Sequence, residues 1–346
     1  MKFPLCSLDT TIPTRIVGSI KIVYDCDAEL VSVPMATFET PLWHSTKRGA
    51  LVSQKTSGIK VAVLGDVMTR SVILEASNLA EAISCANWIK DNEKSIGDAI
   101  ASSSKFAKLK EMRTEIVGRM IYLRLSVETG NASGHNMSTK AADTVMDRVI
   151  SNCNGVKYVS VSGNCCVDKK VSAVNGILGR GKRVSAEIFI PRNICEIILN
   201  TTPEKIVELN VKKNLVGSIL SGGVRSANAH FVNAVLAIYL ATGQDAANIV
   251  EASQGITFAE ITDDDELYFS VNLPNIIVGT VGNGKQLDFA KQNLESMGCF
   301  FNDPSSSRRL AAIIASAVLC SELSLMASLT NKGELMDAHL SLERSA

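Results

Sequence analysis

The sequence has no excess of charge of either sign. Its 346 residues include 35 Lys plus Arg and 35 Asp plus Glu, which gives a formal net charge of zero at pH 7. A protein that binds nucleic acid through phosphates needs a basic face, and a polybasic membrane anchor needs clustered Lys and Arg. We therefore expect no nucleic acid among the partners of this protein, and no membrane surface.

Long uncharged apolar runs are also absent. The longest, at 310–320 and 232–242, are about 11 residues each, whereas a helix that crosses a bilayer needs about 20. The first residues turn polar too early for the apolar segment of a signal peptide. The sequence therefore predicts a cytoplasmic protein without a membrane span.

The short spacings of cysteine and histidine that bind metal are missing. The nine cysteines include no Cys-x-x-Cys pair, and the four histidines lie far apart at 44, 135, 230 and 339. Structural zinc sites depend on short spacings, and an odd cysteine count does not fit a complete disulfide framework. We expect neither a structural metal nor disulfide bonds.

Aliphatic residues dominate what the chain does contain. Hydrophobic residues make up 46% of the sequence and aromatic residues only 5%, so a chain of this length can bury a large aliphatic core. The length is about twice the ~150 residues that are usual for one domain. Strands and helices are predicted in mixed order without strict βαβ alternation, which favours an α+β fold.

The expected elements follow from hydrophobic periodicity and turn residues. Strands are predicted at 16–17, 20–23, 30–33, 115–128, 156–161 and 182–190. Helices are predicted at 38–54, with or without a break near Arg48-Gly49, at 79–112 as one or two helices, and at 135–152, 203–219, 226–242, 286–297 and from 303–305 to 329. The helix at 226–242 is apolar on nearly all sides, which is typical of a buried helix.

Four charged residues lie where their surroundings are apolar or rich in glycine. Glu39 follows an apolar run and is either an acid with a raised pKa or a carboxylate aligned with a helix N-terminus. Lys169 follows a predicted strand and either stabilises a developing oxyanion or belongs to a solvated surface pair. Asp245 is either the partner of Lys169 or a turn residue. His339 lies close to the C-terminus and, taken alone, has the position of a surface histidine.

Three glycine-rich segments, at 179–182, 221–223 and 279–284, are candidates for a nucleotide-binding loop. None of them fits Gly-x-Gly-x-x-Gly after a strand, and none is a Walker loop. A standard Rossmann domain is therefore not predicted.

In combination and in this order, several segments resemble the 3-hydroxy-3-methylglutaryl-coenzyme A (HMG-CoA) reductase family, in its soluble prokaryotic form without a membrane domain. The matching segments are 33–40 (VPMATFET), 65–70 (GDVMTR), 134–140 (GHNMSTK), 161–170 (VSGNCCVDKK), 213–218 (KNLVGS), 228–230 (NAH), 243–245 (GQD), 279–282 (GTVG), 321–327 (SELSLMA) and His339. They cover nearly the whole chain.

The resemblance implies a large catalytic domain with a buried central helix, formed by 1–71 and 161–346. A small ferredoxin-like domain at 72–160 would bind the nicotinamide dinucleotide. The implied reaction is the four-electron reduction of HMG-CoA to mevalonate and coenzyme A with two hydrides. The implied cofactor is NADPH, with NADH as the alternative, and the active site would lie between two subunits of a homodimer or higher oligomer.

The resemblance also implies roles for residues. Lys169 would stabilise the oxyanion, Glu39 would donate a proton to the carbonyl, Asp245 would bridge these two, and His339 would protonate the departing thiolate. The substrate-binding positions are Arg70, Ser162, Asp168, Lys170, Lys213 and Asn233. The cofactor-binding positions are Ser104, Lys105, Asn131, Gly134, His135, Asn136 and Gly282.

Some positions depart from the family pattern. Residues 131–136 read NASGHN where many members have DAMGMN, which puts the cofactor contacts in question more than the chemistry. Two other functions stay open at this point. One is an NAD-linked enzyme that oxidises mevalonate, and the other is a non-catalytic protein that binds coenzyme A thioesters.

Overall fold

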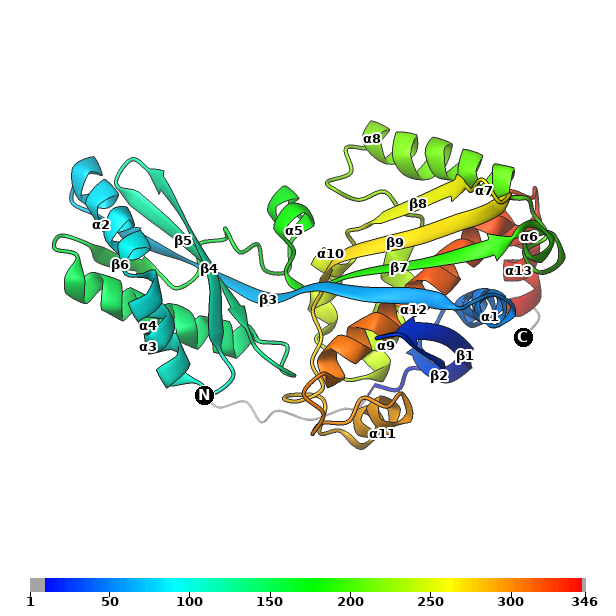
Figure 1. The fold of residues 1–346 in the computed structure, drawn as a ribbon, viewed down its shortest axis with the longest axis horizontal. Helices are drawn as coiled ribbons and strands as arrows, with labels where there is room; N and C mark the ends of the chain where they lie inside the picture. Colours follow the sequence, from blue (N-terminus) through cyan, green and yellow to red (C-terminus); the bar gives the residue numbers. More distant parts are fainter. Residues whose placement is uncertain (1–9, 344–346) are drawn as a thin grey trace.

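The computed structural model describes residues 10–343, and 1–9 and 344–346 lie outside the described part. Strands and helices alternate irregularly along the chain (Figure 1), as the predicted α+β fold requires, so this prediction is confirmed. The strands are β1 (Thr14–Tyr24), β2 (Asp27–Ala36), β3 (Ile59–Glu75), β4 (Lys108–Val117), β5 (Met120–Glu128), β6 (Lys157–Ser160), β7 (Gly181–Pro191), β8 (Ile256–Ile261) and β9 (Glu266–Ile276).

The helices are shorter and more numerous than predicted. They are α1 (Thr40–Lys55), α2 (Leu79–Asp91), α3 (Glu93–Ser103), α4 (His135–Asn152), α5 (Ala173–Leu178), α6 (Arg192–Leu199), α7 (Pro203–Leu209), α8 (Ser218–Leu220), α9 (Phe231–Ala241), α10 (Ile249–Ala252), α11 (Asp288–Ser296), α12 (Ser306–Leu329) and α13 (Glu334–Glu343). A π-helical stretch η1 (Asn210–Gly217) joins α7 to α8, and a 3₁₀ turn η2 (Ala246–Asn248) precedes α10.

Strand β3 connects the two halves of the molecule (Figure 1). Its first half, Lys60 to Val67, pairs with β7, and its second half, Met68 to Glu75, pairs with β5. The strand order of the larger sheet is β2-β1-β3-β7-β9-β8. Residues on either side of the switch in pairing therefore lie at the junction of the two halves, where Arg70 is placed.

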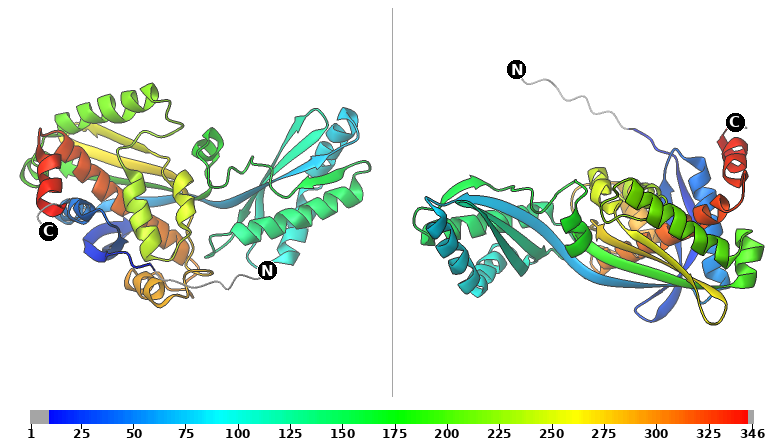
Figure 2. Two further views of the ribbon diagram at one scale, coloured as in Figure 1. Left: turned by 180° about the vertical axis from the view of Figure 1, so that it is seen from behind. Right: turned by 90° about the horizontal axis from the view of Figure 1, so that it is seen from above.

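The buried residues form two separate clusters. The larger cluster includes the inner faces of β1, β2, β7 and β9 with α9 and α12, and the smaller one lies within residues 72–156. Helix α12 is the central element of the larger cluster, since α1, α9 and β7 all pack against it (Figure 2). Burying one Leu, Ile or Met side chain contributes roughly 1.5–3 kcal/mol, so this helix anchors the larger half.

Helix α12 is also long and apolar enough, by length and composition alone, to cross a membrane. The expectation that no apolar stretch reaches the length of a span was wrong, because the uncharged run stops before Glu322 whereas an 18-residue apolar window in α12 extends past this single carboxylate. In the structure 94% of the most apolar window is buried inside the protein. Burial of this kind is typical of the core helix of a globular fold.

The smaller half has the βαββαβ order of a ferredoxin-like fold. Its sheet has the order β4-β5-β3-β6 with antiparallel pairing throughout, and α2, α3 and α4 pack on it. The predicted strand at 115–128 contains the end of β4 and the whole of β5. The chain turns between these two strands at Gly118, which has φ +60°. The predicted helix at 79–112 was wrong beyond Ser103, because 108–117 is paired as β4.

Helix α1 runs without a break at Arg48-Gly49. A Cβ at Gly49 would lie 2.1 Å from the carbonyl oxygen of Cys320, so the glycine allows α1 and α12 to cross at close range. Arg48 then reaches α13 through an ion pair of 2.8 Å with Glu334. The glycine therefore serves helix packing rather than helix termination.

Candidate active site

The loop that follows β6 carries the predicted lysine. Three of its non-glycine residues, Asn164, Val167 and Lys169, have positive φ values of 59°, 45° and 54°. Such conformations cost about 1–3 kcal/mol each and persist only where the surroundings impose them. A loop with this much backbone strain needs many external contacts to keep its shape.

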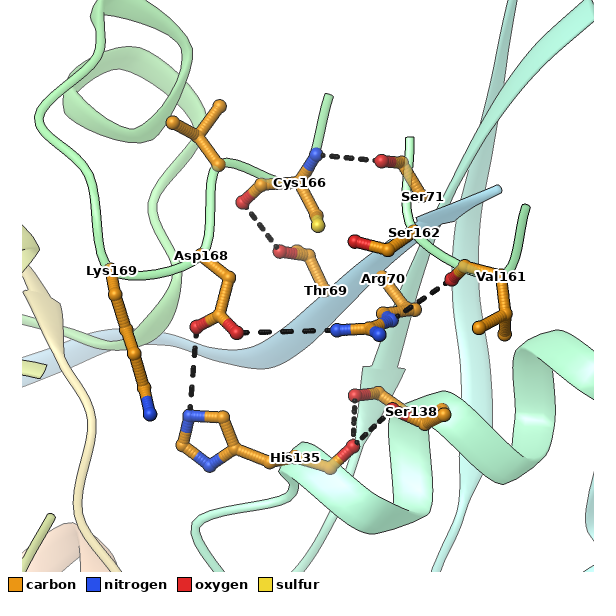
Figure 3. A network of polar contacts seen from close by, with 12 residues as sticks. Thr69, Arg70, Ser71, His135, Ser138, Val161, Ser162, Cys166, Asp168 and Lys169 are labelled. Atoms are coloured by element: carbon orange, nitrogen blue, oxygen red, sulfur yellow. Dashed lines mark hydrogen bonds and ion pairs between the residues drawn. The ribbon is translucent and has the colours of Figure 1, made fainter. Parts of the chain in front are cut away.

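Those contacts come mainly from β3 (Figure 3). The Ser71 hydroxyl accepts the backbone N–H of Cys166 at 3.0 Å, and the Thr69 hydroxyl donates to the carbonyl oxygen of Cys166 at 3.4 Å. Arg70 donates from Nε to the carbonyl oxygen of Val161 at 3.1 Å. The junction strand therefore fixes the loop from one side.

The Lys169 ammonium is paired with Asp245. Nζ lies 2.9 Å from Oδ2, and the other carboxylate oxygen of Asp245 accepts the backbone N–H of Ala247 at 3.0 Å. The hydrogen bond that Lys169 donates to Asp245 raises the pKa of Lys169. Burial acts to raise the pKa of Asp245, but the hydrogen bonds from Lys169 and Ala247 outweigh it, so this pKa is lowered. Both groups are therefore charged at neutral pH.

A buried arginine lies behind the loop. Arg180 is 1% exposed, donates to Glu251 Oε1 at 2.7 Å, and forms an ion pair of 2.8 Å with Asp168. Glu251 is 0% exposed, and its Oε1 also accepts the backbone N–H of Lys169 at 2.9 Å. Burial raises the pKa of Glu251. We call Arg180, Glu251 and Asp168 the buried charge cluster.

In front of the loop is a cavity of about 770 Å³ between the two halves of the molecule. Arg70, Lys169 and Lys285 bring positive charge to it, and Asp168 and Asp245 bring negative charge. Figure 3 shows the side chains of Arg70, Asp168 and Lys169 on the side of the loop that faces α4. Burial lowers the pKa of Lys285.

Two glycine-containing turns close this cavity. Gly134 (φ +93°) precedes α4, and a Cβ there would lie 2.6 Å from the Thr129 side chain. Gly282 (φ +98°) has open space at its Cβ position. A backbone hydrogen bond of 2.8 Å from Thr280 to Asn131 joins the two turns. The glycine at 134 therefore makes room for Thr129, whereas the backbone at Gly282 faces open space and can approach a ligand closely.

His135 lines the same cavity. Its Nε2 is 3.2 Å from Asn248 Oδ1 and 3.8 Å from Asp168 Oδ1. Burial lowers the pKa of His135, so the neutral imidazole predominates at neutral pH. Gly134, His135, Asn136 and Gly282 all line the cavity, whereas the Asn131 side chain bonds the carbonyl oxygen of Asp303 and the N–H of Ser307.

Glu39, Asn233 and His339 line a second cavity, of about 410 Å³, between α1, α9 and α13. Asn233 donates to Glu39 Oε2 at 2.9 Å. Glu39 is the N-cap residue of α1, but its side chain makes no capping hydrogen bond. Within residues 10–343, the predicted catalytic residues are thus divided between two cavities of one chain.

A second buried carboxylate supports this cavity. Glu322 of α12 is 0% exposed and accepts the backbone N–H groups of Ala229 and His230 at 2.6 and 3.0 Å, and the Thr257 hydroxyl at 2.8 Å. These contacts hold the start of α9, from which Asn233 reaches Glu39. A lone acidic residue in the apolar stretch of α12 that follows Arg309 was the signal in the sequence that such a role exists.

The remaining predicted residues lie outside both cavities of the chain. Ser162 and Lys170 are on exposed parts of the loop, and Lys213 is on η1. Ser104 ends α3, and Lys105 follows it on the surface of the smaller half. Further polar residues that line or support the two cavities, and to which the sequence analysis gave no role, are Arg180, Glu251, Lys285, His230 and Glu322.

The fold and this site define an α+β protein with a cavity, lined by cations and carboxylates, at the junction of a ferredoxin-like half and a larger half. A family model for hydroxymethylglutaryl-coenzyme A reductase matches residues 9–344. The chain belongs to this family, so the resemblance seen in the sequence is confirmed.

Relatives from archaea cover almost the whole chain. The 3-hydroxy-3-methylglutaryl-coenzyme A reductase of Pyrococcus abyssi is 42% identical over 337 residues, which is 96% of this chain and 82% of that protein. The corresponding protein of Methanocaldococcus jannaschii is 40% identical, over 96% of this chain and 82% of that one.

The fold is similar to that of a solved bacterial structure. The class II 3-hydroxy-3-methylglutaryl-CoA reductase of Streptococcus pneumoniae bound to NADPH, in open conformations, has a TM-score of 0.75. The two are 17% identical in sequence, and the match covers 93% of this chain and 86% of that one.

Proposed function

We propose that this chain reduces HMG-CoA to mevalonate and free coenzyme A, taking one hydride from each of two NADPH molecules. The observation that carries the proposal is the Lys169 ammonium, which is held 2.9 Å from Asp245 at a large cavity with further cations. Membership of the HMG-CoA reductase family supplies the substrate class.

Lys169 has the chemistry that reduction of a thioester requires. Negative charge develops on the carbonyl oxygen when a hydride reaches the carbon, and a preoriented ammonium stabilises that charge most strongly in a site that excludes water. Asp245 keeps Lys169 charged by raising its pKa. The same ammonium serves both reductions, since each produces an oxyanion at the same carbon.

The cations beside Lys169 suit the free carboxylate of the substrate. The Arg70 guanidinium is oriented by Val161, and its Nη1 lies 4.0 Å from Asp168. A planar guanidinium binds a carboxylate through two parallel hydrogen bonds. We place the substrate carboxylate near Arg70, with Ser162, Lys170 and Lys213 contributing from the cavity edge or from a second subunit.

The residues around the cavity fit a nicotinamide dinucleotide, which supplies the hydride when bound. The N-terminus of the 18-residue helix α4 begins at the cavity, and such a terminus favours the negative charge of phosphates. Gly282, with open space at its Cβ position, allows a close approach of its backbone to the cofactor. Residues 72–160 would form the nucleotide-binding domain, and Ser104 and Lys105 on its surface favour NADPH over NADH.

Glu39 and His339 would complete the site from a second copy of the chain. In this proposal Glu39 donates a proton to the reduced carbonyl, and His339 protonates the departing thiolate of coenzyme A. Glu39 and Lys169 line different cavities of one chain, which is the arrangement expected when an active site forms between two subunits. The protein would act as a homodimer or higher oligomer in the cytoplasm.

A mixing experiment tests the shared site. We expect Glu39→Gln and Lys169→Ala to be inactive as separate homo-oligomers. If the two residues of one site come from different subunits, unfolding and refolding the two variants together restores about a quarter of the wild-type activity by statistical pairing. No recovery from a mixture shown to contain hetero-oligomers would mean that both residues act within one chain.

The activity itself is tested by following reduced nicotinamide absorbance with HMG-CoA, using NADPH and NADH in parallel. We expect oxidation of NADPH at a higher kcat/KM than NADH. Oxidation of neither cofactor by a correctly folded oligomer would disprove the proposed reaction.

A further inference from the structure

The backbone of Lys169 is held by a residue that does not line the cavity. Its N–H donates to Glu251 Oε1 at 2.9 Å, and Glu251 is fully buried behind the loop. The cavity in front of the loop is lined by Lys169 and Asp245 but not by Glu251. Glu251 is therefore within reach of the lysine and out of reach of a ligand in that cavity.

Lys169 is contacted at both ends by one short segment. Asp245, which binds the ammonium, caps η2, and Glu251, which binds the backbone N–H, lies in α10 directly after η2. The carbonyl oxygen of Glu251 accepts a hydrogen bond of 3.1 Å from Asn275 at the end of β9. The segment of η2 and α10, which Asn275 ties to β9 of the larger sheet, therefore provides both contacts to Lys169.

The negative charge of Glu251 is matched by Arg180. The two side chains are 0% and 1% exposed, and the Arg180 guanidinium reaches Glu251 and Asp168 with its two terminal nitrogens. A neutral amide at position 251 could still accept the N–H of Lys169, but it would leave the guanidinium with a single carboxylate. The charge-assisted hydrogen bond from Arg180 to position 251 would become a weaker neutral one, while the Arg180–Asp168 pair stays matched, so the hold on the Lys169 backbone would loosen.

The left-handed conformation of Lys169 makes this support necessary. With φ at 54°, the residue occupies a region that non-glycine residues adopt only when their contacts impose it. Ser71, Thr69 and Asn175 hold the loop at Cys166 and Val167. Glu251 is the partner of the Lys169 backbone itself.

We propose that Glu251 is a positioning residue for Lys169, and that its buried carboxylate, balanced by Arg180, fixes the backbone from which the ammonium reaches Asp245 and the reacting oxygen. The inference deepens the proposed function and rests on it only for its kinetic consequences. A displacement of about 1 Å at a reacting group can reduce turnover about 100-fold.

The first test needs no enzyme activity. Lys169 is accessible to solvent, and its amine reacts with an acylating reagent only when deprotonated. Glu251→Gln should loosen the contact with Asp245, and it also removes a charge that itself raises the pKa of Lys169, so labelling measured by peptide mass spectrometry at pH 8–9 becomes several-fold faster. Glu251→Asp keeps that charge, so faster labelling of Lys169 in this variant reports the displaced backbone alone. Lys170, on the same loop, is the internal reference and should react at its wild-type rate.

The second test is kinetic. We expect Glu251→Gln to reduce kcat about 30- to 100-fold while the KM for HMG-CoA changes less than about 3-fold, because the Arg180–Asp168 pair behind the substrate site is kept. Glu251→Asp keeps the charge and should lose less kcat. In a Lys169→Ala background, Glu251→Gln should cause no further loss, since the carboxylate acts only through the lysine.

The control is Glu29→Gln, which removes one partner of an ion pair of 2.6 Å with Arg309, and neither of these residues lines the cavity. It should retain wild-type labelling and kcat. If Glu251→Gln does not fold, Glu251→Asp is tested in both assays and should shift each in the same direction by a smaller factor.

Unchanged labelling of Lys169 relative to Lys170 in a folded Glu251 variant would overturn the inference, as would a further loss of turnover in the Lys169→Ala background. If the wild type has no reductase activity, the proposed function fails, and the labelling result alone then decides the role of Glu251.

Discussion

Arg180 and Arg192 each lie between two carboxylates, and the two arginines differ mainly in burial. Arg180 is 1% exposed and contacts Glu251 and Asp168, whereas the Arg192 side chain is 32% exposed and contacts Glu204 and Asp265 at the surface. Arg192 connects α6, α7 and the β8–β9 turn. Arg180 connects the lysine-bearing loop to α10.

The pKa values of Glu204 and Glu251, the carboxylates beside the two arginines, shift in opposite directions. Hydrogen bonds from Arg192 lower the pKa of Glu204 to about 2, while burial raises the pKa of Glu251 despite its contact with Arg180. Water screens the exposed group of charges, so this low pKa does not signify a large contribution to stability. The buried cluster is costly unless every partner is in place, so it fixes positions rather than adding much stability.

The largest effect on kcat is expected from substitution of Lys169, the residue whose backbone the buried charge cluster holds in position. Lys169→Ala should reduce kcat about 1,000-fold, equivalent to about 4 kcal/mol of transition-state stabilisation, because no other ammonium replaces it beside the oxyanion. Steady-state kinetics with HMG-CoA and NADPH measure this. Lys212→Ala, at an exposed lysine paired with Glu208, is the matched control and should keep wild-type kcat. A loss below 10-fold at Lys169 would contradict its role.

The next effect is on stability. Arg180→Met should reduce the free energy of unfolding by about 3–5 kcal/mol, because it leaves two carboxylates next to each other without their cation. Urea unfolding followed by circular dichroism gives this difference. A change below about 1 kcal/mol would show that the cluster is hydrated rather than buried.

A smaller effect is expected from the ion pair between the Lys169 ammonium and the Asp245 carboxylate in front of the loop. The raised pKa of Lys169 means that its pairing stabilises the fold below the ordinary lysine pKa and that this contribution is lost as the pH rises through the raised value. Asp245→Asn removes the carboxylate that is the main cause of the raised pKa of Lys169, so this pKa should fall. Labelling of Lys169 as a function of pH should then show its midpoint at lower pH, and an unchanged midpoint would refute the pairing in solution.

The smallest effect is expected at the exposed arginine. Arg192→Met should leave both kcat and the urea midpoint within experimental error of the wild type, because surface ion pairs contribute little. A destabilisation as large as that of Arg180→Met would remove the distinction between the two clusters.

The sequence predicted the periodic elements well. Helix α4 was expected at 135–152 and is observed at His135–Asn152, because its apolar residues recur at helical spacing and a glycine precedes it. Strand β3 was not predicted, since Gly65, Asp66 and Arg70 interrupt its apolar pattern. These residues lie where β3 changes its pairing partner from β7 to β5, and no local sequence pattern marks such a change of partner.

The site was predictable only in part. Asp245 was proposed from the sequence as a partner of Lys169, and the structure places the two charges 2.9 Å apart. Arg180 was noticed only as part of a glycine-rich segment, and Glu251 not at all. Their contacts join residues about 70 to 80 positions apart, so only the folded chain shows that both are buried beside the same loop.

The most direct test of the account is the stoichiometry of the reaction. One progress curve should record NADPH oxidation by absorbance and release of the coenzyme A thiol with a thiol reagent, with HMG-CoA as the limiting substrate. The account predicts two NADPH oxidised for each thiol released, with both signals lost in Lys169→Ala. A thiol released without NADPH oxidation, or a wild-type rate in Lys169→Ala, would contradict it.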